Sequence, residues 1–167
     1  PQTKPVAFDG ASLFFSYDPT RERIDLTEWT VRSADLTLAA SGHAYLPGVT
    51  TGVPTQVLAQ IQIDSLQLDP EGVLNQPVVF EQGALDFRVR LDPFGIDIGQ
   101  VSLIHHGERL QASGRVEAEP EGWSVAVDAA LDQIAHDRLL ALWPAKIVPK
   151  TRLWVSENVQ EGLLSNV

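Results

Sequence analysis

The chain has 167 residues, of which 44% are apolar and 20% charged, and its formal net charge is −10. This length fits one domain, or two small ones that share a core. Its apolar stretches are only a few residues long, whereas a helix needs about 20 apolar residues to cross a bilayer. The acidic balance disfavours nucleic acid and anionic membrane surfaces as partners. With no cysteine in the sequence, disulfides, thiolate catalysis and Cys-type zinc sites are excluded.

Methionine is absent as well. A chain without an initiator that opens on Pro1 to Lys4 is expected to be a segment of a longer protein. The sequence therefore does not tell whether a signal peptide or membrane anchor accompanies it.

Alternation of apolar and polar residues with a period of two predicts a series of strands. Five such apolar rows follow one another along the chain. They are a row beginning with Leu36, Leu38 and Ala40; Val57, Ala59, Ile61 and Ile63; Leu85, Phe87, Val89 and Leu91; Leu110, Ala112, Gly114 and Val116; and Trp123, Val125, Val127, Ala129 and Leu131. Gly, Pro and Asp residues separate these rows as turns, for example Pro47-Gly48 and Asp92-Pro93. The pattern predicts a mainly β protein built as an antiparallel meander.

The chain contains an internal repeat with an offset of 72 residues. Six residues then match identical ones, namely Ile24, Asp25, Leu38, Ala40, Ser41 and Gly42 against residues 96, 97, 110, 112, 113 and 114. In both copies the apolar parity slips at the same point, after Leu26 and after Ile98, which predicts a shared β-bulge. We expect two repeat units, residues 1–72 and 73–134, in a one-dimensional array.

The last part of the chain has helical character. Residues 135–142 predict a short helix that stops at Trp143-Pro144. Residues 151–160 predict a second helix with Thr151 as N-cap and Gly162 just past its end. Residues 135–162 are therefore expected to be two helices with a Trp-Pro linker, and residues 163–167 the beginning of another strand.

Residue clusters that could carry chemistry are few. His105 and His106 stand next to each other at a predicted hairpin tip, where neighbouring side chains on a strand point to opposite faces and cannot share an ion. His43 and His136 are isolated. The acidic residues Glu117, Glu119 and Glu121 lack the Asp-x-Asp-x-Asp-Gly pattern of a calcium loop. No motif of a hydrolase, nucleotide-binding or dinucleotide-binding site occurs, so we expect no catalytic residue, no metal and no cofactor.

One apolar face shared by the strands needs a cover, and the sequence supplies only two short helices to provide it. Either the strands fold over into a sandwich with the helices at one end, or part of the face stays open as a groove for apolar ligands. The residues assigned to this face are Ile24, Leu26, Trp29, Val31, Leu36, Leu38, Ala59, Ile61, Ile63, Leu85, Phe87, Val89, Ile96, Ile98, Val101, Leu103, Leu110, Trp123, Val125, Val127 and Leu131.

Residues 136–164 read HDRLLALWPAKIVPKTRLWVSENVQEGLL. This segment resembles a stretch of the YhdP-like, AsmA-related bacterial envelope proteins, in which a Leu-rich helix and a Trp-Pro pair lead into a Trp-containing helix that ends near an Asn and a Gly. The matching positions are His136, Leu139, Leu142, Trp143, Pro144, Pro149, Thr151, Arg152, Trp154, Asn158 and Gly162.

The resemblance implies a curved, taco-shaped sheet with an apolar groove. AsmA-like and TamB-like proteins of Gram-negative bacteria are anchored in the inner membrane, extend across the periplasm and are thought to move phospholipid towards the outer membrane. Here the apolar face would contact acyl chains, and no catalytic residue or cofactor would be needed. The competing hypotheses are a self-contained β-sandwich that binds protein or glycan, and a hydrolase with paired acids, for which the sequence names no pair.

Overall fold

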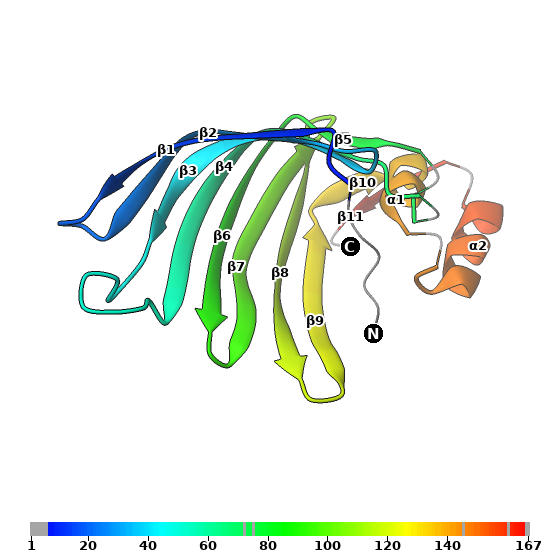
Figure 1. The fold of residues 1–167 in the computed structure, drawn as a ribbon. Coiled ribbons are helices and arrows are strands. Elements are labelled where there is room, and N and C mark those ends of the chain that lie inside the picture. The colour runs from blue at the N-terminus through cyan, green and yellow to red at the C-terminus, as the bar shows by residue number, and fades with distance from the viewer. Residues whose placement is uncertain (1–6, 72, 75, 145, 160, 166–167) are drawn as a thin grey trace.

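The computed structural model describes residues 7–71, 73–74, 76–144, 146–159 and 161–165. The main sheet contains β1 (Gly10–Asp18), β2 (Arg23–Arg32), β3 (Leu36–Tyr45), β4 (Gln56–Leu68), β5 (Val78–Phe80), β6 (Gln82–Leu91), β7 (Phe94–His105), β8 (Glu108–Glu119) and β9 (Gly122–Leu131). The C-terminal part contains β10 (Gln133–Ala135), α1 (His136–Leu142), α2 (Pro149–Asn158) and β11 (Leu163–Ser165). Figure 1 shows the sheet as an arch, with the helices beside its C-terminal end.

The sheet is an antiparallel meander. Its strand order is β1-β2-β3-β4-β6-β7-β8-β9, and β5 pairs with the end of β4. The predicted meander is therefore confirmed, whereas the sandwich is wrong. Each long strand pairs with its neighbour in the chain, so among the described residues none is left to form a second layer over the first. The one other sheet there is the two-stranded β10-β11 pair.

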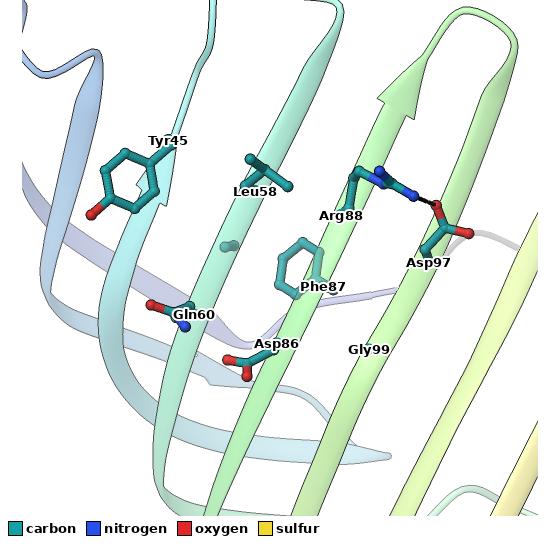
Figure 2. Close-up of a pocket in the computed structure, with 9 residues that line it drawn as sticks. Tyr45, Leu58, Gln60, Asp86, Phe87, Arg88, Asp97 and Gly99 are labelled. Carbon is teal, nitrogen blue, oxygen red and sulfur yellow. Dashed lines mark hydrogen bonds and ion pairs between the residues drawn. The ribbon is translucent and has the colours of Figure 1, made fainter.

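Cross-strand pairing places the apolar rows on one face of the sheet. Ala40 faces Ile63, which faces Gly83, and Gly83 faces Leu103. Figure 2 looks onto the face of the sheet that carries Gln60, Asp86 and Asp97, and β1 and β2 pass behind the middle strands in this view. The sheet therefore bends away from the viewer, and the opposite, apolar face is concave. On a concave face side chains converge, which explains why Ile61 and Ile63 are each only 5% exposed.

The shared β-bulge is confirmed. In β2, Leu26 pairs with Gly42 and Trp29 with Ala40, so two residues of β2 face one residue of β3. In β7, Ile98 pairs with Gly114 and Val101 with Ala112, so two residues again face one. Every one of these pairs is related to its counterpart by the offset of 72, and the repeat seen in the sequence is a repeat of strand register.

The two helices differ from the prediction at their ends. The first helix, α1, ends as predicted but begins at His136, because Ala135 belongs to β10. The second helix, α2, begins at Pro149 and not at Thr151, and its N-cap is Val148. Proline is favoured in the first helical turn, because its φ is preset and its missing N–H would have no partner there. Thr151 therefore lies inside the helix. The predicted end is also wrong, because α2 ends at Asn158 and Val159 is already extended; Gln160 itself lies outside the described residues.

The strand predicted over residues 163–167 forms as β11 and pairs with β10, which the sequence patterns did not indicate. Residues 166–167 of that strand, and the Pro1 to Lys4 stretch at the other terminus, are outside the described residues.

Candidate functional site

The concave face forms an apolar trough, a name used here for the inward-facing residues of β1 to β9. One row across the strands consists of Tyr17, Ile24, Ala44, Ala59, Phe87, Ile98, Gly114 and Val127. A second row consists of Phe15, Leu26, Gly42, Ile61, Leu85, Val101, Ala112 and Ala129. The inward positions of β3 and β8 are small residues in both rows. We call these small residues, Gly42, Ala44, Ala112 and Gly114, the floor of the trough. Larger side chains on neighbouring strands project farther from the sheet than the floor does.

Close strand packing requires a glycine in this floor. A Cβ on Gly42 would lie 2.2 Å from the Gln60 carbonyl oxygen and 2.9 Å from Ile61 Cα, both backbone atoms, and its φ is +152°. L-residues rarely adopt this φ. At the equivalent position of the second repeat, a Cβ on Gly114 would lie 2.6 Å from the Ala126 carbonyl oxygen.

All residues assigned to the apolar face from the sequence lie on the concave side by strand register. They are not equally accessible. Ala59 and Ile61 on the central strand β4 are 5% exposed, whereas Val125 and Val127 on the outer strand β9 are 62% exposed. The trough is therefore tightly packed at its centre and open towards β9.

Sequence reasoning missed the contribution of β1. Leu13 and Phe15 face Trp29 and Leu26 across the β1-β2 pair and so belong to the trough. The repeat offset carried a signal for them, because Leu13 and Phe15 match Leu85 and Phe87 at a distance of 72. Extending the self-comparison towards the N-terminus would have found this strand.

A cavity of about 440 Å³ lies where the trough meets α1. We call it the end cavity. Its lining is wholly apolar and comes from the β4-β5 connection, from β5, from the ends of β7 to β9 and from α1; it includes Leu74, Val78, Phe80, Leu103, Leu139 and Leu142. Its volume falls within the range of small-molecule sites, roughly 300–1,000 Å³.

The residues of the family-like motif hold the two helices together. Arg152 of α2 donates hydrogen bonds to the carbonyl oxygens of Leu140, at 3.0 Å, and of Trp143, at 3.2 Å. The Trp143 indole N–H donates to the Ile147 carbonyl oxygen at 2.7 Å. The two Arg152 bonds satisfy carbonyl groups that the C-terminal end of α1 leaves free, and the Trp143 bond joins the end of α1 to the connection before α2.

Other motif residues contribute to the same corner. Leu139, Leu142, Trp143 and Pro144 line the end cavity. The His136 N–H donates to the Gly162 carbonyl oxygen at 3.2 Å, and Asn158 donates to the carbonyl oxygen of Trp154, which is itself 60% exposed. Pro149 starts α2 and Thr151 lies within it.

The convex face carries a shallow hollow of about 510 Å³ between β3 and β7 (Figure 2). Asp97 lies at its side and accepts hydrogen bonds from Arg88 at 3.0 Å and from Arg115 at 2.8 Å, with Arg90 at 3.5 Å. Desolvation by its surroundings would raise the pKa of Asp97, but the hydrogen bonds from Arg88 and Arg115 and the charge of Arg90 outweigh it and hold this pKa below its usual value. A carboxylate engaged in this way is a structural anion and a poor proton donor.

The two adjacent histidines do not point apart as predicted. Their ring centroids are 4.4 Å apart, because His106 lies in the turn with a φ of +51° and does not continue the strand. The His105 ring contacts the Val79 carbonyl oxygen, and the His106 N–H donates to Glu81 at 3.1 Å. Within the described ranges, no three His, Asp or Glu residues are grouped as a metal site would require.

Comparisons with known proteins add no relative, since no family model, curated protein or solved structure matches this chain. Neither α1 nor α2, nor any other helix in the described part of the chain, is long and apolar enough to span a membrane. The apolar trough and its end cavity are thus the features on which a function can be argued.

Proposed function

We propose that this chain binds phospholipid by its acyl chains along the apolar trough, as a segment of an AsmA-like protein that conducts lipid between the inner and outer membranes of a Gram-negative envelope. One observation carries the proposal. An uninterrupted apolar face crosses all eight strands of the meander, and in the described residues no second sheet covers it. The face is exposed at its two ends, where Phe15 of β1 is 58% and Val125 of β9 is 62% exposed, and exposed apolar surface of this kind is typical of a binding site.

The dimensions of the trough suit an acyl chain. Adjacent strands lie about 4.8 Å apart, so a row across eight strands extends over roughly 34 Å. Each CH₂ group transferred from water to an apolar surface contributes about 0.8 kcal/mol. An acyl chain lying in a row would gain this energy while the polar headgroup remains in water at the rim. Such passive binding needs no catalytic group.

The end cavity supports the same proposal. It continues the apolar surface beneath α1 and offers a wholly apolar lining to the end of a chain. The motif that fixes α1 to α2 is also the segment that resembles the AsmA-related proteins. On this proposal the family-like residues shape one end of the lipid path, and the location is the periplasm, in a protein anchored in the inner membrane.

The test is to express the chain in a Gram-negative host, purify it and record its native mass. Bound material is then extracted with solvent and identified. We expect phospholipid to co-purify. A lipid-free protein that also fails to take up phospholipid from vesicles would contradict the proposal.

Neighbouring residues of β9 provide a matched pair of variants. Val125 and Ser124 are both exposed and lie on opposite faces of one strand. Val125→Asp places a charge in the trough and should reduce lipid occupancy several-fold, whereas Ser124→Asp on the convex face should leave it unchanged. Phe87→Asp and Arg88→Asp form the same contrast at the centre of the sheet. Equal loss for both members of a pair, with the circular dichroism spectrum intact, would count against the assignment of the face.

A further inference from the structure

The two outer strands of the sheet leave apolar side chains in water. On β1, Leu13 is 52% and Phe15 58% exposed, and on β9, Val125 and Val127 are each 62% exposed. Proteins usually protect an edge strand with lysine, proline or a bulge. Neither β1 (GASLFFSYD) nor β9 (GWSVAVDAAL) contains Lys, Arg or Pro. Both edges are therefore long and apolar, and within the described residues no strand pairs with the outer side of either one.

The sheet contains an example of how such edges fit together. Where the first repeat meets the second, β4 pairs with β6 over Gln56–Ile63 and Gly83–Arg90. Ala59 faces Phe87 and Ile61 faces Leu85 in this junction, and the β4 members of these pairs become buried.

In the repeat, each of the two outer strands is equivalent to one of the two strands that form this junction. β1 corresponds to β6, because Leu13 faces Trp29 as Leu85 faces Val101, at an offset of 72. β9 corresponds to β4, because Gly42 and Gly114 are equivalent in the repeat and face Ile61 of β4 and Val127 of β9, respectively. Ile61 and Val127 are therefore equivalent, at an offset of 66. The free edge of β9 thus matches the edge of β4 that holds β6, and the free edge of β1 matches the edge of β6 that holds β4.

We propose that β9 of one molecule pairs antiparallel with β1 of a second copy of this chain, in the register of the β4-β6 junction. The corresponding pairs are Trp123 with Tyr17, Val125 with Phe15 and Val127 with Leu13 on the concave face, and Ala126 with Phe14 on the convex face. The pairing covers the large apolar side chains exposed on both edges. It also sets a small residue against the exposed Phe14, so the two surfaces are complementary in size.

Such a contact joins two different surfaces, so each copy retains one free edge and further copies can add. The apolar troughs of successive copies would run on without interruption, because the junction reproduces the one within the chain. This association needs no lipid, so it can be tested on the lipid-free chain.

Sedimentation velocity of the lipid-free chain over a hundredfold range of concentration is the first test. We expect the weight-average sedimentation coefficient to rise with concentration. Val127→Lys should weaken association by about tenfold or more, since it places an ammonium group in the junction. Ser65→Lys, on the exposed convex side of the central strand β4, is the matched control and should associate like the parent. A chain that stays monomeric throughout would overturn the proposal.

Cross-linking tests the register. The chain has no cysteine, so introduced thiols are the only ones present. One sample mixes a Val127→Cys variant with a Leu13→Cys variant, and a second mixes Ala126→Cys with Phe14→Cys. Neighbouring pairs in an antiparallel ladder alternate between hydrogen-bonded and non-hydrogen-bonded, so the two mixtures test one pair of each kind. Paired Cα atoms lie about 4.5–5.5 Å apart, within reach of a disulfide. We expect disulfide-linked heterodimers from both mixtures and few from Val127→Cys with Ser12→Cys, which the register places on opposite faces. Equal yields from matched and mismatched mixtures would overturn the register.

Discussion

The two repeat units have the same strand register but very different burial. Ala59 of β4 is 5% exposed, and Val125, which occupies the equivalent place in β9, is 62% exposed. Both strands have the same kind of partner on one side, β3 or β8. On the other side β4 has β6, whereas β9 has no strand among the described residues. Burial in this protein therefore comes from lateral neighbours and curvature more than from a covering layer.

The ion pairs of the two units differ as well. Asp25 and Asp97 are equivalent in the repeat. Asp25 accepts a hydrogen bond from one arginine, Arg23, at 2.8 Å, and the residue opposite it is His43, which bonds to Gln60 instead. Asp97 is surrounded by three arginines, since Arg115 stands where the first unit has His43. The second unit thus has more cross-strand ion pairing on its convex face.

The largest contrast is expected from truncating equivalent apolar side chains. Ile61→Ala should lower the free energy of unfolding by about 3 kcal/mol, because it opens a cavity in the packed centre of the trough. Val127→Ala at the equivalent edge position should change it by about 0.5 kcal/mol or less. Urea denaturation followed by tryptophan fluorescence, at a concentration where the chain is monomeric, measures both. Equal losses would mean that β9 is as well packed as β4.

The next contrast concerns the two floor glycines. Gly42→Ala should cost about 2 kcal/mol, because the new Cβ meets backbone atoms of β4, which is held between two strands. Gly114→Ala should cost about 1 kcal/mol, since its neighbour β9 has a free side and can move. Thermal unfolding by calorimetry distinguishes them. A larger cost at Gly114 would show that β9 is held more firmly than its free edge indicates.

The smallest effect concerns pH. Because the folded state holds the pKa of Asp97 below its ordinary value, its ionisation stabilises the fold at a pH above about 4, and this contribution disappears as the pH falls through the lowered pKa. Asp97→Asn should therefore be less stable at pH 7, and its stability should depend less on pH below about 4. Asp25→Asn, which removes a single arginine contact, should have the weaker effect. Urea midpoints measured from pH 7 to pH 3 test this, and identical pH profiles for Asp97→Asn and the parent would refute it.

The sequence indicated the β-rich meander, the offset of the repeat and the position of the bulge. These features depend on local alternation, and a slip of one residue would turn every apolar side chain to the other face. The same reasoning failed at the ends of elements. Threonine is a good cap, so the sequence predicts that α2 starts at Thr151, whereas the helix starts at Pro149, which is favoured in the first turn. Strand alternation predicts the His105 and His106 rings on opposite faces, but the turn brings them together.

For the candidate site, the apolar residues of β2 to β9 could be assigned to one face from the sequence alone, because the strand period of two decides the face. Whether that face is covered could not be decided in this way. A sandwich and an open arch require the same alternation, and they differ only in how strands far apart in the chain are placed. The end cavity is likewise a product of tertiary structure, since it forms where α1 meets strand ends that are distant in sequence. Local periodicity determines which side chains share a surface, but curvature and the packing of distant elements decide which parts of that surface remain open.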